Sequence, residues 1–507
     1  MIYYSTQDKT VTATLEQGVK RGMAPNRGLF MPQQIPVLTR KELEQVKNSS
    51  SLAEVGQVIA RRLFGDDVPA PALEEIVDDA LNFDTPVVKV SEGIYALELF
   101  HGPTLAFKDV GARFMARLLQ HFTSDTETQV HVLVATSGDT GSAVANGFLG
   151  VPGISVHVLY PSGQVSALQE KQFTTLGENI TALEVDGSFD DCQALVKQAF
   201  ADDVLRSEMT LTSANSINLA RFLPQSFYYF RGWSQMVTGQ AGSGRGTSAQ
   251  TSSSQVADRK LVSGPAGSGP TGNKQVGDVQ TGSGPTGNKQ VGDVQTGSGP
   301  VGSGPVGTGR SDTHPLVISV PSGNFGNLTA GLIAREMGLP VHTFLAASNA
   351  NDVVPEYLET SKYAPRPSVQ TIANAMDVGA PSNFERILDL FDHRHDRITR
   401  HMKGYRYSDD QISKTMKQVY ETTGYILDPH GATGYEAACE YIAAHPGSNV
   451  MFLETAHPAK FPDTVKEAIG VEAETPERLK AFAAGTKQSV EIPASYEDFR
   501  SYLVKVR

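Results

Sequence analysis

The chain has 507 residues and a formal net charge of −12, with 39% hydrophobic and 19% charged residues. This length predicts about two to four domains with a large buried core. The acidic balance excludes nucleic acid or an anionic membrane surface as the main partner, since both need a basic face. Two cysteines are too few for a disulfide framework. With no signal-like or membrane-length apolar segment, we expect a soluble, cytoplasmic protein, either monomer or dimer.

The elements expected from the pattern, taken along the chain, alternate between strand and helix. We predict strands at 130–134, 154–159, 180–185, 315–320 and 341–346. We predict helices at 140–148, after the cap Ser188, at 215–236 and at 328–337. This alternation indicates an α/β protein with parallel sheets covered on both faces.

One segment differs in composition from the rest. Residues 239–309 are mostly Gly, Ser, Thr, Pro and Gln, and SGPTGNKQVGDVQTG occurs unchanged at 268–282 and 283–297. A repeat that folds needs an apolar face to bury against its neighbour, and each unit here has only two valines. We predict a disordered insert in a surface loop, more suited to a tether than to docking a partner.

Three segments carry residues suited to chemistry. Lys108 lies in a largely apolar surround, and desolvation lowers a lysine pKa as Schiff-base formation requires. Residues 134–142 (VATSGDTGS) place hydroxyls and backbone N–H groups between a strand and a helix, where they can hold a carboxylate. Residues 321–327 (PSGNFGN) form a second such turn, whose glycines let N–H groups converge on a phosphate.

Each segment taken alone also has a simpler interpretation. Lys108 could be an ordinary surface lysine, and the hydroxyls of 134–142 could only cap a helix. Residues 321–327 could be a tight glycine turn without a ligand. We expect no metal site, because His393 and His395 lack a convergent third ligand.

Together, and in this order, the three segments resemble those of fold-type II pyridoxal-phosphate (PLP) enzymes. Longer motifs are similar to the threonine synthase family, and the resemblance extends over nearly the whole chain outside the insert. These motifs are 3–6 (YYST), 22–32 (GMAPNRGLFMP), 213–221 (SANSINLAR), 349–352 (NAND), 375–378 (AMDV), 381–386 (PSNFER) and 454–461 (ETAHPAKF).

The resemblance assigns roles to individual residues. Lys108 would form the Schiff base and move protons, Thr455 would bond the pyridine nitrogen, and Asp139 would face the ring oxygen. Asp139 stands where related enzymes often have Asn, which leaves its partner open. The cofactor phosphate would be held by Gly323, Asn324, Phe325, Gly326 and Asn327. The substrate carboxylate would be bound by Thr136, Ser137, Gly138 and Thr140. The candidates for the substrate phosphate are Thr104, Ser213, Asn215, Asn218, Arg221 and Lys460.

The implied activity is the conversion of O-phosphohomoserine and water into threonine and phosphate, the last step of threonine biosynthesis. A threonine or serine dehydratase, which eliminates from Cβ, is the main alternative. Arg221 and Lys460 favour the synthase, because they could bind a second phosphate. A non-catalytic relative is a further alternative, which the retained Lys108 disfavours.

The implied fold has two open-sheet α/β domains with the cofactor in the cleft between them. We assign residues 1–92 to an N-terminal region and 93–238 to the domain with the lysine and the carboxylate turn. The insert follows at 239–309. Residues 310–507 form the domain with the cofactor-phosphate loop and the C-terminal region.

Overall fold

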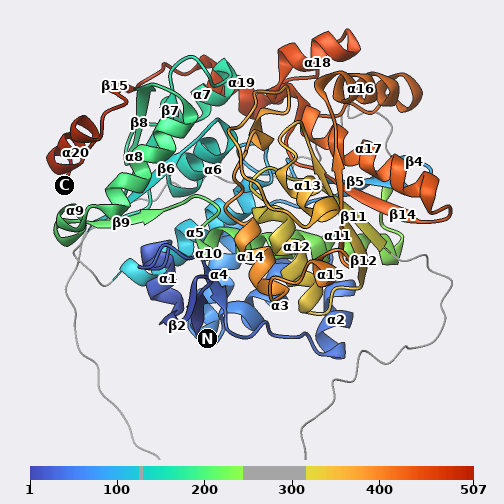
Figure 1. Ribbon diagram of the computed structural model, residues 1–507, viewed down its shortest axis with the longest axis horizontal. Coiled ribbons are helices and arrows are strands. Elements are labelled where there is room, and N and C mark those ends of the chain that lie inside the picture. The colour runs from blue at the N-terminus through green and yellow to red at the C-terminus, as the bar shows by residue number, and fades with distance from the viewer. Residues whose placement is uncertain (125–128, 244–315) are drawn as a thin grey trace, which may run out of the picture. The chain divides into compact units, whose positions relative to one another are not determined.

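Residues 1–124, 129–243 and 316–507 are described by the computed structural model, and they belong to one unit. Most of the segment 239–309, and with it the predicted disordered insert, lies outside the described residues. The described chain forms three sheets with helices packed against them (Figure 1). None of the helices in these ranges has the length and apolar character that a bilayer span requires.

The N-terminal region combines a small antiparallel sheet with four helices. The strands, in the order β2-β1-β3, are β1 (Tyr3–Ser5), β2 (Asp8–Ala13) and β3 (Phe30–Pro32). The helices are α1 (Leu15–Arg21), α2 (Arg40–Lys47), α3 (Leu52–Phe64) and α4 (Ala70–Ala80). Thr14 and Thr39 begin α1 and α2 with capping boxes, which satisfy first-turn N–H groups.

A five-stranded sheet is parallel throughout. Its order is β15 (Val490–Pro493), β8 (Ile180–Asp186), β7 (Ile154–Pro161), β6 (Val130–Ala135) and β9 (Thr210–Ser213). Alternate residues of β6 enter opposite cores: Val132 and Val134 face the core that includes α6, whereas Leu133 and Ala135 face the one that includes α8. Burial on both faces explains the continuous apolar run of β6. The helices of this half are α5 (Lys108–Thr123), α6 (Asp139–Phe148), α7 (Ala167–Thr174), α8 (Phe189–Ala201), α9 (Asp203–Glu208), α19 (Glu477–Ala484) and α20 (Tyr496–Lys505).

A seven-stranded sheet contains the segment that follows the insert. Its order is β10 (Gly242–Ser243), β4 (Val87–Ser91), β5 (Ile94–Glu98), β14 (Asn449–Glu454), β11 (Leu316–Pro321), β12 (Val341–Ser348) and β13 (Met402–Arg406). Its helices are α10 (Leu219–Phe222), α11 (Ser226–Thr238), α12 (Gly326–Glu336), α13 (Val353–Thr360), α14 (Phe384–Leu390), α15 (His395–Ile398), α16 (Asp409–Thr423), α17 (Pro429–Ala444) and α18 (Pro462–Ile469). Short 3₁₀ turns occupy Leu223–Gln225, Asn374–Met376 and Pro458–Lys460.

The predicted α/β fold is confirmed, with two corrections to its elements. The expected helix 215–236 is wrong: a loop follows β9, Asn218 caps the short α10, and α11 begins only at Ser226. Pro224 between them cannot donate an intrahelical hydrogen bond. The sheets are also not wholly parallel, since the N-terminal sheet is antiparallel and β4 runs antiparallel to β5. Only two residues, Glu92 and Gly93, connect β4 to β5, and a connection this short can join antiparallel strands only, as a hairpin. Gly93 adopts φ +72° in this turn.

The boundaries at 93 and 310 stay a prediction. Strand pairing crosses both of them: β4 pairs with β5 across the boundary at 93, and β5 with β14 and β15 with β8 across the boundary at 310. Figure 1 shows the red C-terminal segment with β15 and α20 lying beside the green and teal elements of the five-stranded sheet. The five- and seven-stranded sheets are therefore each assembled from segments far apart in the chain.

Candidate active site

The carboxyl ends of four parallel strands open into one cavity of about 1200 Å³. Segments that follow β6, β9, β11 and β14 line it, together with the start of α5. β6 and β9 belong to the five-stranded sheet and β11 and β14 to the seven-stranded sheet, so the carboxyl edges of both sheets line this cavity, and open α/β sheets bind ligands at that edge. The three segments chosen from the sequence therefore meet in one place.

Lys108 is the first residue of α5, and its side chain is 15% exposed at the cavity. Its Nζ lies 3.6 Å from Oδ2 of Asp139. Burial lowers the pKa of the Lys108 amine, and the charges of Lys460 and Arg221 lower it further, while Asp139 opposes them. The ordinary surface lysine is thus excluded, and the amine is set up to lose its proton more readily than a free lysine.

Asp139 has a definite partner in this structure. Its Oδ1 lies 2.5 Å from Nζ of Lys460 and accepts a hydrogen bond of 2.8 Å from Nε2 of Gln169. Burial alone would raise the pKa of this carboxyl, but the charges of Lys460 and Lys108 hold it well below its usual range. Asp139 is therefore a carboxylate held between the Nζ atoms of Lys108 and Lys460.

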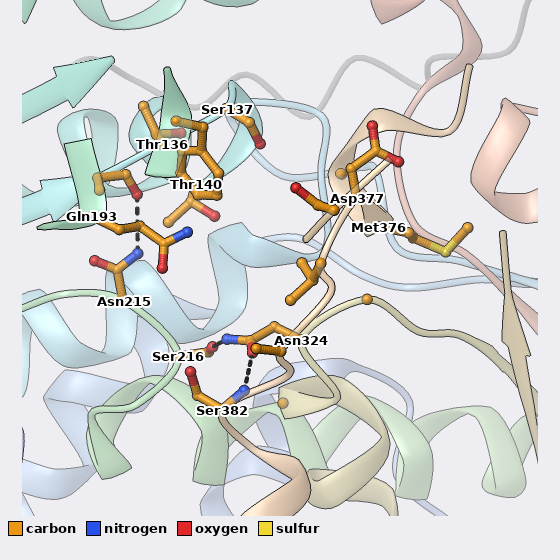
Figure 2. Close-up of a pocket in the computed structure, with 18 of the residues that line it drawn as sticks. Thr136, Ser137, Thr140, Gln193, Asn215, Ser216, Asn324, Met376, Asp377 and Ser382 are labelled. Carbon is orange, nitrogen blue, oxygen red and sulfur yellow. Dashed lines mark hydrogen bonds between the residues drawn. The ribbon is translucent and has the colours of Figure 1, made fainter. Parts of the chain in front are cut away.

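The turn after β6 uses some of its polar groups internally. Oγ1 of Thr136 accepts hydrogen bonds from the N–H groups of Gly138 and Gly141, at 2.9 and 2.8 Å. Gly138 has φ +142° and does not line the cavity; a Cβ there would lie 2.8 Å from the Gln169 side chain. Thr136, Ser137 and Thr140 lie on one side of the cavity (Figure 2). Ser137 and Thr140 are the half-exposed hydroxyls left for a ligand.

The loop from Gly323 to Asn327 joins β11 to α12 and lines the cavity with all five residues. Phe325, with φ +60°, caps α12, whose first N–H groups have no intrahelical partner. Oδ1 of Asn327 accepts from the hydroxyls of Tyr228 and Tyr229, at 2.6 and 2.7 Å. This leaves Nδ2 of Asn327 buried without a hydrogen-bond partner. The loop thus presents donors to an anion.

The segment after β9 places Ser213, Asn215 and Arg221 at the cavity. Nη1 of Arg221 donates to the carbonyl of Lys108 at 3.0 Å, while its Nε is buried without a partner. Burial lowers the pKa of Arg221 to about 10, so the guanidinium stays protonated near neutral pH. Nδ2 of Asn215 donates to the carbonyl of Ala135 at 3.0 Å.

Three residues expected at the substrate phosphate do not line the cavity: Thr104, Asn218 and Lys460. Oγ1 of Thr104 donates to Asp109 at 2.6 Å. Nδ2 of Asn218 donates to the carbonyls of Val19 and Ser213, at 2.9 and 3.1 Å. Lys460 is fully buried, with its ammonium on Asp139 and the carbonyl of Thr104. Their polar groups are used to hold other parts of the site.

Sequence reasoning missed several residues of the site. Ser216 lines the cavity, and its Oγ accepts from Nδ2 of Asn324 at 2.9 Å. Ser216 lies inside the motif 213–221, so that motif was its signal. Gln169, which holds Asp139, lies outside every motif and had no such signal.

The fold and the site together define a class, the fold-type II PLP enzymes. The family model described as pyridoxal-phosphate dependent enzyme matches residues 80–269 and 309–455. Models described as threonine synthase N terminus and threonine synthase, C-terminal match residues 2–81 and 431–503.

Individual proteins agree with these models. The chain is 37% identical over 506 residues to threonine synthase from Haemophilus influenzae, covering 100% of both. The crystal structure of threonine synthase from Escherichia coli is 35% identical with a TM-score of 0.79, covering 100% of both chains. That of PLP-bound threonine synthase from Brucella melitensis is 29% identical with a TM-score of 0.79, covering 99% of this chain and 98% of that chain. This chain belongs to the threonine synthase family.

The cofactor of the chain is PLP, and the residues present fit it. Lys108 supplies a buried amine, and the unpartnered Nδ2 of Asn327 supplies a donor beside the N-terminus of α12. At Gly323, a Cβ would lie 2.6 Å from the Cα of Met376, so backbone alone fits there. Thr455 lines the cavity, and its carbonyl accepts the N–H of Phe107 at 2.9 Å, which ties it to the lysine segment.

Proposed function

We propose that the chain acts as a threonine synthase, converting O-phosphohomoserine and water into L-threonine and inorganic phosphate. One arrangement carries this proposal: the Lys108 amine shares a cavity with Arg221 and Asn327, each of which keeps a buried donor without a partner. A reaction that handles both a phosphorylated cofactor and a phosphorylated substrate needs two groups of anion donors.

For the cofactor, we assign Lys108 as the attachment point and residues 323–327 as the phosphate cradle. Thr455 would face the pyridine nitrogen, and Asp139 would lie near the ring oxygen. When bound, PLP withdraws electrons from the substrate carbon next to the amine. A neutral hydroxyl such as that of Thr455 leaves the ring nitrogen unprotonated, which moderates this withdrawal.

The work left to the protein is proton transfer. The reaction takes a proton from Cα and another from Cβ, and breaks the bond between Cγ and the phosphate oxygen. A proton is then added at Cγ, water gives hydroxide to Cβ and its remaining proton to the released phosphate, and a proton returns to Cα. Nζ of Lys108 is the group placed to move these protons, because burial lowers its pKa. Asp139, 3.6 Å away, would orient the amine without competing as a base, since its own pKa is held low.

For the substrate, we assign the carboxylate to Ser137 and Thr140, with Thr136 and Gly138 shaping their turn. We assign the substrate phosphate to Ser213, Asn215 and Arg221. Thr104, Asn218 and Lys460 take positioning roles in this proposal, because their polar groups already hold Asp109, the β9 segment and Asp139.

The test is phosphate release and threonine formation from O-phosphohomoserine by the purified chain with PLP. Lys108→Ala should lose turnover and the absorbance of the lysine-bound cofactor. Lys466→Ala, whose ammonium pairs with Glu472 at the surface, is the matched control and should keep both. Formation of oxo-acid from threonine or serine without phosphate release would favour the dehydratase. If the purified chain bound no PLP, the proposed function would be refuted.

We further propose a cytoplasmic enzyme that acts on a small molecule, without a nucleic-acid or membrane partner. The net charge of −12 and the two free cysteines, Cys192 and Cys439, support this. Cell fractionation with antibody detection checks the location, and light scattering decides between monomer and dimer.

A further inference from the structure

Arg386 on α14 is fully buried, yet its guanidinium donates to three separate parts of the chain. Nε donates to the carbonyl of Phe30 at 3.2 Å, and Nη1 donates to the carbonyl of Ser216 at 3.0 Å. Nη2 donates to the carbonyl of Ile217, and Nη1 also donates to Oδ1 of Asn383. One side chain thus joins β3, the segment after β9 and the start of α14.

All four acceptors of Arg386 are neutral. Among the described residues, no carboxylate lies within 4.0 Å of its guanidinium, and its Cζ stacks 4.0 Å from the ring centre of Phe222. Burial lowers the pKa of Arg386 to about 9, with Glu385 acting in the opposite direction, so the group remains cationic near neutral pH. A buried cation without a counter-ion is costly, and an anion bound nearby would offset that cost.

The segment that Arg386 holds is part of the cavity wall. Ser216 and Ile217 line the cavity, whereas Arg386 does not. The carbonyl oxygens of Ser216 and Ile217 accept hydrogen bonds from Arg386 inside the protein. These oxygens are the negative ends of the peptide dipoles, and they are therefore turned away from the cavity. An incoming phosphate therefore does not meet them.

The same segment is tied to the loop assigned to the cofactor phosphate. Oγ of Ser216 accepts from Nδ2 of Asn324 at 2.9 Å and from Nδ2 of Asn383 at 3.0 Å. Oδ1 of Asn324 accepts the N–H of Ser382 at 2.6 Å. Figure 2 shows Ser216, Asn324 and Ser382 joined in this way. The orientation of Ser216 therefore depends on Arg386, Asn383 and Asn324 together.

We propose that Arg386 is a positioning residue for the substrate phosphate: it turns the Ser216–Ile217 carbonyls away from the cavity and keeps a fixed positive charge behind this wall. This inference rests on the proposed function, in which residues around Ser216 bind the phosphate of O-phosphohomoserine. Arg386 touches no ligand in this role. It acts through Ser216 and Ile217.

Arg231 on α11 offers a matched control. It is also buried and donates to two backbone carbonyls, those of Ser49 and Ser50, but it pairs with the carboxylate of Asp84. Arg231 does not line the cavity, and neither do its partners Ser49, Ser50, Asp84 and Ser234. Arg231→Lys therefore reports the cost of disturbing a buried arginine as such.

The experiment measures KM for O-phosphohomoserine, kcat, and Ki for inorganic phosphate as a competitive inhibitor, at saturating PLP. Arg386→Lys keeps a charge but cannot reach three segments at once, and we expect KM and Ki to rise about tenfold, the scale of a lost charge-assisted hydrogen bond. We expect kcat to change by less than about threefold, since Lys108 is untouched. Arg231→Lys should leave KM and Ki unchanged.

Melting curves followed by circular dichroism accompany each variant. If Arg386→Lys does not fold, Asn383→Ala carries the test, because it removes one bond to Arg386 and one to Ser216; we expect KM and Ki to rise about threefold. Equal effects of the Arg386 and Arg231 variants would overturn the inference, as would a change confined to PLP affinity or kcat. If the wild-type chain released no phosphate from O-phosphohomoserine, the proposed function itself would fail, which is a separate result.

Discussion

The buried contact between Asp139 and Lys460 gives the most quantitative prediction. Asp139→Asn removes the negative charge with little change of shape, and Lys460→Met removes the positive charge while keeping an unbranched side chain. The two groups are 2.5 Å apart, and their side chains are 3% and 0% exposed. Each single variant therefore leaves one charge in the interior without its main partner.

The structure predicts unequal costs for the two variants. Removing one partner of a buried ion pair costs roughly 3–5 kcal/mol. Lys460→Met should lie at the low end, because Asp139 keeps Lys108 at 3.6 Å and the amide of Gln169 at 2.8 Å. Asp139→Asn should lie at the high end, because the ammonium of Lys460 then keeps only neutral acceptors, the carbonyl of Thr104 at 2.9 Å and the amide oxygen of the substituted side chain. In the double variant neither charge remains. Its loss of unfolding free energy should therefore be smaller, by about 2–3 kcal/mol, than the losses of the two single variants added together.

Urea titration of the four proteins before PLP is added, followed by circular dichroism, measures these free energies of unfolding, because Lys108 keeps its free amine under that condition. A cycle in which the two costs add to within about 0.5 kcal/mol would refute the reasoning, because independent sites behave in that way. A larger cost for Lys460→Met than for Asp139→Asn would show that Lys108 does not stabilise the carboxylate. The same preparations report turnover, which separates a loss of stability from a loss of activity.

Three further predictions follow from single features. Gly323→Ala should weaken PLP binding by at least about tenfold, measured by cofactor absorbance, because its Cβ would lie 2.6 Å from the Cα of Met376. Burial and the charge of His131 lower the pKa of His157 to about 3, whereas an unfolded histidine titrates near about 6.5. Below about pH 6.5 the unfolded chain therefore binds one more proton than the folded chain, and the free energy of unfolding should fall by about 1.4 kcal/mol per pH unit. Urea unfolding at pH 7 and pH 5 measures this loss, which should be smaller in His157→Gln. Deletion of 270–308, which the family model leaves unmatched, should keep kcat within about twofold in the phosphate-release assay.

Local patterns in the sequence were enough for the elements that form the site. The Ser188–Asp191 capping box predicted the start of α8, and the apolar run of β6 predicted a strand buried on both faces. The lysine segment and the two strand-to-helix turns were found because each is short and continuous. Helix capping and strand alternation are set by neighbours along the chain, so one sequence suffices to read them.

Tertiary structure alone decided how the polar groups of these segments pair. Asn218 and Lys460 are polar residues within recognised motifs, yet packing directs them into the protein, away from the cavity. Asp139 pairs with Lys460, and Arg386 donates to the carbonyl of Ser216. In both cases the two residues lie far apart in the sequence. A buried charge takes whichever partner the packed backbone brings within hydrogen-bond distance, and that distance is set by long-range packing that no local pattern encodes.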